Sequence, residues 1–208
     1  MRLVGLPNLK HSWICSLPKA YRTKPDWTLR VVGEINVNAL AERVSRITPE
    51  EWDEWKQRQK SVHKEARAVP FQWCHNISGY DPDKDDEFND IKVFPPYEEY
   101  KEELDRIYAY LDEIEGPAKM VTGILVNLPS GKIIPDHIDK PDFKIFQRTK
   151  RYHIPLITHP DVRFRHSGET WNLEKGKIYE LNNIVGRHGV RNASPVDRVH
   201  ILTDRYPL

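Results

Sequence analysis

From residue 119 onward, the chain is a series of short β-forming segments separated by turns. The segments are rich in Val, Ile, Leu and Tyr, and Pro, Gly, Ser and Asn stand between them. Their regular spacing is typical of an antiparallel β-sandwich or a compact barrel, which commonly holds one small ligand in its mouth. The expected strands cover residues 120–128, 151–157, 162–166, 177–181, 188–192 and 198–204.

The first 118 residues predict a mixed α/β part with helices. Thr48 is a good N-cap for a helix, because Pro49 takes the first helical position and Glu51 the third. Residues 77–96 contain Gly, Pro and a run of acidic side chains, which predicts a loop with a solvated charged surface rather than a calcium site. The expected strands are 29–37 and 68–74, and the expected helices are 37–47, 48–59 and 97–115.

Size and charge indicate one domain, residues 1–208, without a strongly charged partner. The net charge is +1, from 32 basic and 31 acidic side chains, so no broad field favours nucleic acid or an anionic membrane. The two cysteines, Cys15 and Cys74, form no disulfide framework or zinc pattern. Neither a membrane span nor a signal peptide is recognisable, so we expect a reduced, cytoplasmic protein. The oligomeric state is left open.

Four side chains suggest a metal centre with an anion site beside it. His137 and Asp139 are two residues apart, so on an extended strand both would point to the same side. His188 follows, and Arg198 comes ten residues later. Two imidazoles and one carboxylate hold iron(II) on one face, and an arginine fork matches a carboxylate. Ordinary surface histidines are the competing interpretation.

A second His-x-Asp triplet is present at His159-Pro160-Asp161. Its central proline fixes φ and removes a backbone donor, which suits a turn better than a ligand-bearing strand.

Alternation along two strands adds to the pattern. Arg151 and His153 share one face of their strand, and Arg198 and His200 share one face of another. Such polar faces are either solvated surfaces or the lining of a lumen that binds an anion. The neighbouring ligand set favours the lumen.

Residues 126–206 resemble the aspartyl/asparaginyl β-hydroxylase family, cupin-type oxygenases that use Fe(II) and 2-oxoglutarate. The resemblance covers about 80 of the 208 residues, in the order and near the spacing of the family. It is carried by NLPSGKIIPDH (127–137), RYHIPL (151–156), WNLEKGK (171–177), HGVRN (188–192) and DRVHILTD (197–204).

The resemblance implies a double-stranded β-helix (cupin/jelly-roll) barrel over 119–208, flanked by the N-terminal helices, in an α+β, mainly β fold. It implies that His137 and His188 bind iron, that Arg198 pairs with the distal carboxylate of 2-oxoglutarate, and that Arg151 and His153 help to hold this co-substrate. It also favours His137 over His159 as the first ligand and gives Asn192 a structural role.

Asp139 completes the triad, as in the free-proline hydroxylases of the family, whereas the animal β-hydroxylase lacks this carboxylate. The expected activity is therefore hydroxylation of an unactivated C–H bond with Fe(II), 2-oxoglutarate and O2. The substrate is either a free amino acid or similar small polar molecule, or an amino-acid side chain in a protein. Two alternatives are a non-catalytic cupin that binds a metal or small carboxylate, and a zinc-dependent isomerase or hydrolase.

Overall fold

The computed structural model describes residues 27–74, 90–139, 148–183 and 185–208. Cys15, the amino terminus and most of the expected loop 77–96 lie outside these residues. The elements are β1 (Leu29–Glu34), α2 (Asn38–Val44), α3 (Pro49–Asp53), η2 (Arg58–Lys60), β2 (Arg67–Cys74), β3 (Ile91–Val93), α4 (Pro96–Glu99), α5 (Lys101–Glu115), β4 (Ala118–Leu128), β5 (Ile133–His137), β6 (Lys150–Ile157), β7 (Val162–His166), β8 (Glu169–Trp171), β9 (Lys177–Leu181), β10 (His188–Asn192) and β11 (Arg198–Pro207).

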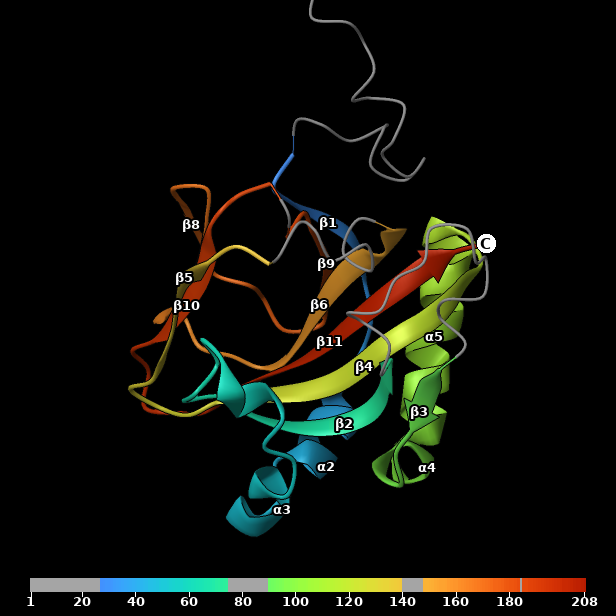
Figure 1. Ribbon diagram of the computed structural model, residues 1–208, viewed down its shortest axis with the longest axis horizontal. Coiled ribbons are helices and arrows are strands. Elements are labelled where there is room, and N and C mark those ends of the chain that lie inside the picture. Colours follow the sequence, from blue (N-terminus) through green and yellow to red (C-terminus); the bar gives the residue numbers. More distant parts are fainter. Residues whose placement is uncertain (1–26, 75–89, 140–147, 184) are drawn as a thin grey trace, which may run out of the picture.

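The described strands form two antiparallel sheets (Figure 1). The larger has the order β1-β9-β6-β11-β4-β2-β3, and the smaller has the order β5-β10-β7-β8. Strands that are neighbours in space are often distant in sequence, as in β11, which lies between β6 and β4. The expected mainly β architecture with flanking N-terminal helices is confirmed.

Both faces of the larger sheet are buried, but against different partners. On β4, Val126 points toward the smaller sheet and belongs to one apolar cluster with Phe164 and Val190. The adjacent Leu125 points the other way and belongs to a second cluster, which includes Leu104 of α5. Period-two alternation therefore divides each central strand between a helix-facing core and an inter-sheet space.

The helix-facing core explains why α2 and α5 form. Leu104, Ile107 and Leu111 recur at helical spacing on α5 and are fully buried. Leu40 and Val44 of α2 belong to the same cluster. The helices therefore cover the outer face of the larger sheet and leave the space between the sheets for other side chains.

All three expected helices differ from the sequence prediction, and α2 covers only Asn38–Val44 of the expected 37–47. The capping box at Thr48 is present, but α3 ends at Asp53 and a 3₁₀ turn follows at Arg58–Lys60. The reason is that Trp52 packs in the helix-facing core, whereas Trp55 packs on Trp73, with ring centroids 5.3 Å apart.

The expected helix 97–115 is interrupted in the same way. It is divided into α4 and α5 at Tyr100, whose φ of −107° and ψ of 12° are not helical. The buried Tyr100 ring packs on Phe71, with ring centroids 5.6 Å apart.

Three short strands were missed, and one was predicted too long. β1 ends at Glu34 rather than at residue 37, and β3 occupies part of the expected loop 77–96. β5 and β8 fall between the strand ranges expected from the sequence. All three missed strands have five residues or fewer, so they carry little alternation from which pairing could be inferred.

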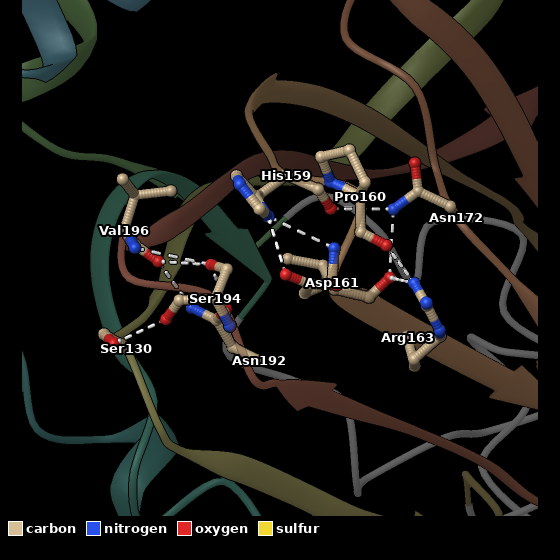
Figure 2. A network of polar contacts seen from close by, with 10 residues as sticks. Ser130, His159, Pro160, Asp161, Arg163, Asn172, Asn192, Ser194 and Val196 are labelled. Carbon is tan, nitrogen blue, oxygen red and sulfur yellow. Dashed lines mark hydrogen bonds and ion pairs between the residues drawn. The ribbon is translucent and has the colours of Figure 1, made fainter.

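Asn192 ties the end of β10 to the start of β11 (Figure 2). Its amide nitrogen donates to the carbonyl oxygens of Leu128 (3.0 Å) and Val196 (2.8 Å). Its amide oxygen accepts from the backbone nitrogen and the hydroxyl of Ser194, at 3.1 and 2.6 Å. The side chain is fully buried. The expected structural role of Asn192 fits these contacts, which fix the loop that delivers Arg198.

Replacing Asn192 by alanine is expected to lower the free energy of unfolding by about 2–4 kcal/mol, because buried carbonyl and hydroxyl groups lose their partner. Urea unfolding followed by circular dichroism measures this change. Asn38→Ala, at an exposed position on α2, serves as the control and is expected to stay within about 0.5 kcal/mol of the parent protein. An Asn192 variant as stable as this control would contradict the structural role.

Candidate active site

Strand pairing brings the two candidate histidine ligands together. His188 is the first residue of β10, His137 is the last residue of β5, and the two are direct partners in the sheet. Their ring centroids are 4.4 Å apart. The register then shifts between His188 and Val190, so that β5 holds one extra residue. Sequence positions 51 residues apart therefore meet at one end of the smaller sheet.

Asp139 joins them from the segment after β5. The expectation that His137 and Asp139 share a strand is wrong, because β5 ends at His137. Nevertheless, one ligand atom from each of His137, Asp139 and His188 lies within 4.8 Å of the other two. Nε2 of His137 is 3.7 Å from Oδ1 of Asp139. Metal bonds of about 2.0–2.2 Å place two ligand atoms at most about 4.4 Å apart, so small movements would seat one ion.

Both histidines have surroundings that suit a metal ligand. Nδ1 of His137 lies 2.8 Å from the carbonyl oxygen of Pro135, so Nδ1 donates. Nε2 is then left buried and without a hydrogen-bond partner, as in a metal-ligating imidazole. The His188 ring stacks on His166, with centroids 5.8 Å apart and planes 9° from parallel. Burial lowers the pKa of His188 to about 4, so this ring is neutral near pH 7.

The Asp139 carboxylate is held between two donors. Nδ2 of Asn183 donates to its Oδ2 at 2.7 Å, and Arg151 forms an ion pair with the same oxygen. Burial alone would raise the pKa of Asp139, but the charge of Arg151 and the Asn183 hydrogen bond keep it below its ordinary value. The carboxylate is therefore ionised. Arg151 also makes two hydrogen bonds to Asp204, at 2.7 and 3.0 Å, so its guanidinium bridges two carboxylates.

Arg198 is a buried cation of a different kind. Only 2% of the residue is exposed, and Nη2 contacts Nδ1 of His200 at 2.7 Å. Its Nε has no hydrogen-bond partner, and no carboxylate in the described parts of the chain pairs with it. Burial, followed by the charge of Arg58, lowers the pKa of Arg198 to about 9. A buried guanidinium without a counterion creates a site for an anion.

One cavity between the sheets unites these groups. Arg151 and His153 of β6 and Arg198 and His200 of β11 all line it. The alternation expected from the sequence is therefore real, and its polar face lines a lumen rather than a solvated surface. Both ring nitrogens of His153 are buried and unpartnered, and burial holds the pKa of His153 well below its ordinary value. Apolar walls come from Val126, Ile134, Phe164, Val190 and Leu202.

Two residues of this cavity were missed. Arg58 and His63 also line it, and the His63 ring lies 5.0 Å from that of His137. Both lie before the barrel, in and just after a 3₁₀ turn. Neither residue belongs to a motif or a periodic pattern, so nothing in the sequence indicated that it would line the cavity. Asn183, the donor to Asp139, was missed for the same reason.

The second His-x-Asp triplet lies elsewhere. His159 and Asp161 contact each other at the turn before β7, where the Asp161 backbone nitrogen donates to Nδ1 of His159 at 3.2 Å (Figure 2). Neither residue lines the cavity or belongs to the group of possible metal ligands. The expectation that the proline places this triplet in a turn is confirmed.

A model of the family described as aspartyl/asparaginyl beta-hydroxylase matches residues 57–207, from just before η2 to the last strand. The chain belongs to this family. It is accordingly a 2-oxoglutarate-dependent hydroxylase. The matched region includes every residue discussed above as a candidate ligand or anion-binding group. No curated protein matches the sequence.

Solved structures share the fold of this chain at low identity. HygX from Streptomyces hygroscopicus, with nickel and 2-oxoglutarate bound, has a TM-score of 0.54 at 13% identity, over 92% of this chain and 88% of that one. A Pseudomonas putida prolyl-4-hydroxylase has a TM-score of 0.52 at 14% identity, over 91% and 96%. A collagen prolyl hydroxylase of Paramecium Bursaria Chlorella virus-1 has a TM-score of 0.51 at 6% identity, over 88% and 97%.

None of the helices in the described part of the chain has the length and hydrophobicity to cross a bilayer.

Proposed function

We propose that this protein binds Fe(II) through His137, Asp139 and His188 and 2-oxoglutarate through Arg198. With O2, it then hydroxylates a C–H bond of a small polar molecule or of an amino-acid side chain. One observation carries the proposal: three possible ligands lie within 4.8 Å of one another, and two of them, His137 and His188, line the cavity that also contains a buried Arg198 without a carboxylate partner among the described residues. A metal site and a site for a carboxylate are thus adjacent.

Each side chain has a part suited to its surroundings. His137 and His188 would offer ring nitrogens to the ion and Asp139 a negative charge, and the remaining coordination positions would be open to other ligands. Iron, 2-oxoglutarate and O2 together supply the oxidising power, while the protein supplies orientation and a shaped, largely dry cavity. Arg198 binds the distal carboxylate of 2-oxoglutarate, and His200 orients the guanidinium.

We assign the remaining contacts with 2-oxoglutarate to Arg151 and His153. Arg151 keeps Asp139 ionised and in place through its ion pair, and Asp204 fixes Arg151 from the other side. His153 lines the cavity with both nitrogens available for a polar ligand. Two structurally similar proteins support the choice of co-substrate, since HygX and the viral collagen prolyl hydroxylase both bind 2-oxoglutarate.

We also assign the chain to a single oxygenase domain, residues 1–208, with its site in the barrel core 119–208. The shared helix-facing core supports this, because α2 and α5 bury their apolar sides on strands of the barrel. The contribution of Arg58 and His63 to the cavity supports it too.

The function is tested by following the conversion of 2-oxoglutarate to succinate. The protein is loaded with iron, given ascorbate and O2, and succinate is measured by mass spectrometry in the presence of mixtures of amino acids, peptides and nucleosides. We expect succinate that depends on iron, together with one component that gains one oxygen atom. Binding of 2-oxoglutarate without succinate in every mixture would indicate a sensor instead, and equal turnover of a component with zinc would contradict iron chemistry.

A further inference from the structure

Arg58 reaches the candidate active site from outside the barrel. It begins η2, whose neighbouring residues Gln57 and Lys60 are exposed. Its side chain nevertheless lines the cavity together with Arg198, His137 and His188, and its Nε is buried without a hydrogen-bond partner. Because the backbone lies at the surface and the guanidinium points inward, Arg58 extends from the rim of the cavity toward its interior.

The charges around the cavity are not balanced in the described structure. Arg151 is paired with Asp139 and Asp204, whereas Arg58 and Arg198 have no carboxylate partner among the described residues. Three guanidinium groups and a ferrous ion would thus face two carboxylates. When the dianion 2-oxoglutarate is counted with these groups, one positive charge remains in excess. No carboxylate of the described residues neutralises this charge, and a second anion would do so; an unpaired buried charge is costly.

The position of Arg58 indicates which anion this is. His63, five residues further along the same segment, packs on the ring of His137, so this segment covers the side of the cavity with the candidate iron ligands. A substrate must approach that side to present its C–H bond. Arg198, by contrast, lies on the central strand β11, where 2-oxoglutarate is proposed to bind.

We propose that Arg58 anchors a carboxylate of the substrate, and that the substrate is a small free acid such as an amino acid. This inference rests on the proposed function of the same site. A small acid can bring its carboxylate to the buried Nε, whereas a residue within a polypeptide has its backbone carboxyl group in an amide bond. Burial, with the charge of Arg151, lowers the pKa of Arg58 to about 10, which agrees with a guanidinium that lacks its counterion.

The test compares Arg58→Gln with Lys60→Gln, which removes a positive charge from an exposed position of the same turn. The full chain is loaded with Fe(II) without O2, and the charge-transfer absorption of its complex with 2-oxoglutarate is titrated. A pool of free L-amino acids is then added, and a pool of the corresponding amides is added to a second sample. The readout is the change in this absorption, which requires no turnover.

In the parent protein and in Lys60→Gln, we expect the acids but not the amides to change the absorption. In Arg58→Gln, 2-oxoglutarate is expected to bind within about threefold of the parent, while the acid pool is needed at a concentration at least about tenfold higher. Arg58→Lys, which keeps the charge and loses the fork, is expected to be intermediate. Thermal unfolding shows whether each variant is folded. If Arg58→Gln does not fold, the result for Arg58→Lys is used in its place to test the assignment.

Three results would overturn the assignment. In the first, Arg58→Gln loses 2-oxoglutarate itself, which would make Arg58 a co-substrate residue. In the second, Arg58→Gln responds to the acid pool like the parent. In the third, the parent protein responds to no acid, or equally to the amides. Failure of the proposed function looks different, because the parent protein would then form no charge-transfer complex with iron and 2-oxoglutarate.

Discussion

Replacing His137 by alanine is expected to weaken Fe(II) binding by at least about a hundredfold and to abolish the formation of succinate. The loss of one of three protein ligands should exceed the 10- to 100-fold effect typical of residues that only support a ligand. Metal titration of the purified protein, together with the iron content after dialysis, measures the change. Because the His137 side chain is largely buried at the end of β5, thermal unfolding of the variant is measured as well, to show that it is folded.

The chain contains its own control for this experiment. His159 stands in the same His-x-Asp pattern, but it lies at a turn outside the cavity. His159→Ala is expected to retain iron and activity within about twofold of the parent protein, because surface substitutions away from a site have small effects. Equal losses of iron from both variants would show that His137 has no special role, and the proposed metal centre would then be wrong.

Much of this site could be predicted because its chemistry follows the period of a strand. Arg151 and His153, like Arg198 and His200, are two residues apart, so each pair had to share a face. The sequence alone could not say whether those faces met water or a lumen. Burial of the opposite faces under α2 and α5 decides this, because Tyr152, Ile154 and their equivalents on β11 pack against helices. The polar faces then turn toward the smaller sheet.

The parts that could not be predicted depend on tertiary contacts between irregular segments. Asp139 follows a strand instead of lying on it, and its position depends on Asn183 and Arg151. Arg58 lies where a continuous helix was expected, and the break that turns it inward arises because Trp52 and Trp55 pack in different places. Such contacts leave no periodic trace in the sequence, so pattern and spacing identified the candidate ligands but not the residues around them.

The two faces of the larger sheet therefore have different roles: one stabilises the fold, and the other carries the candidate ligand-binding groups. Its outer face has an apolar core with the helices, while part of its inner face carries three buried imidazoles or guanidinium groups without acidic partners among the described residues: His153, Arg198 and His200. Burying such groups lowers the stability of the ligand-free fold. Residues that bind a ligand are often retained at this kind of cost. Arg198 offers the clearest case, since binding and stability should change there in opposite directions.

Arg198→Ala is expected to weaken 2-oxoglutarate binding by about 2–5 kcal/mol, the usual cost of removing one partner from a buried charge pair. This corresponds to roughly a 30- to 5,000-fold increase in Kd. Iron binding is expected to stay within about threefold, because Arg198 is not among the possible metal ligands. Anaerobic titration of the iron-loaded protein measures the first quantity, and metal titration measures the second. Arg198→Lys is expected to recover only part of the affinity, since an ammonium group lacks the planar fork.

The same substitution has an opposite expected effect on the protein without ligands. Arg198 is 2% exposed and unpaired among the described residues, so alanine removes an uncompensated buried charge, and urea unfolding of the ligand-free protein should show no loss of stability. Arg191→Ala is the matched control, because Arg191 is exposed on β10 and contacts no part of the site. A variant that lost iron and 2-oxoglutarate equally would show that Arg198 supports the fold of the site rather than the co-substrate. If the variant bound 2-oxoglutarate as well as the parent protein does, another cation of the cavity would have to bind the co-substrate, and Arg58 would be the first candidate.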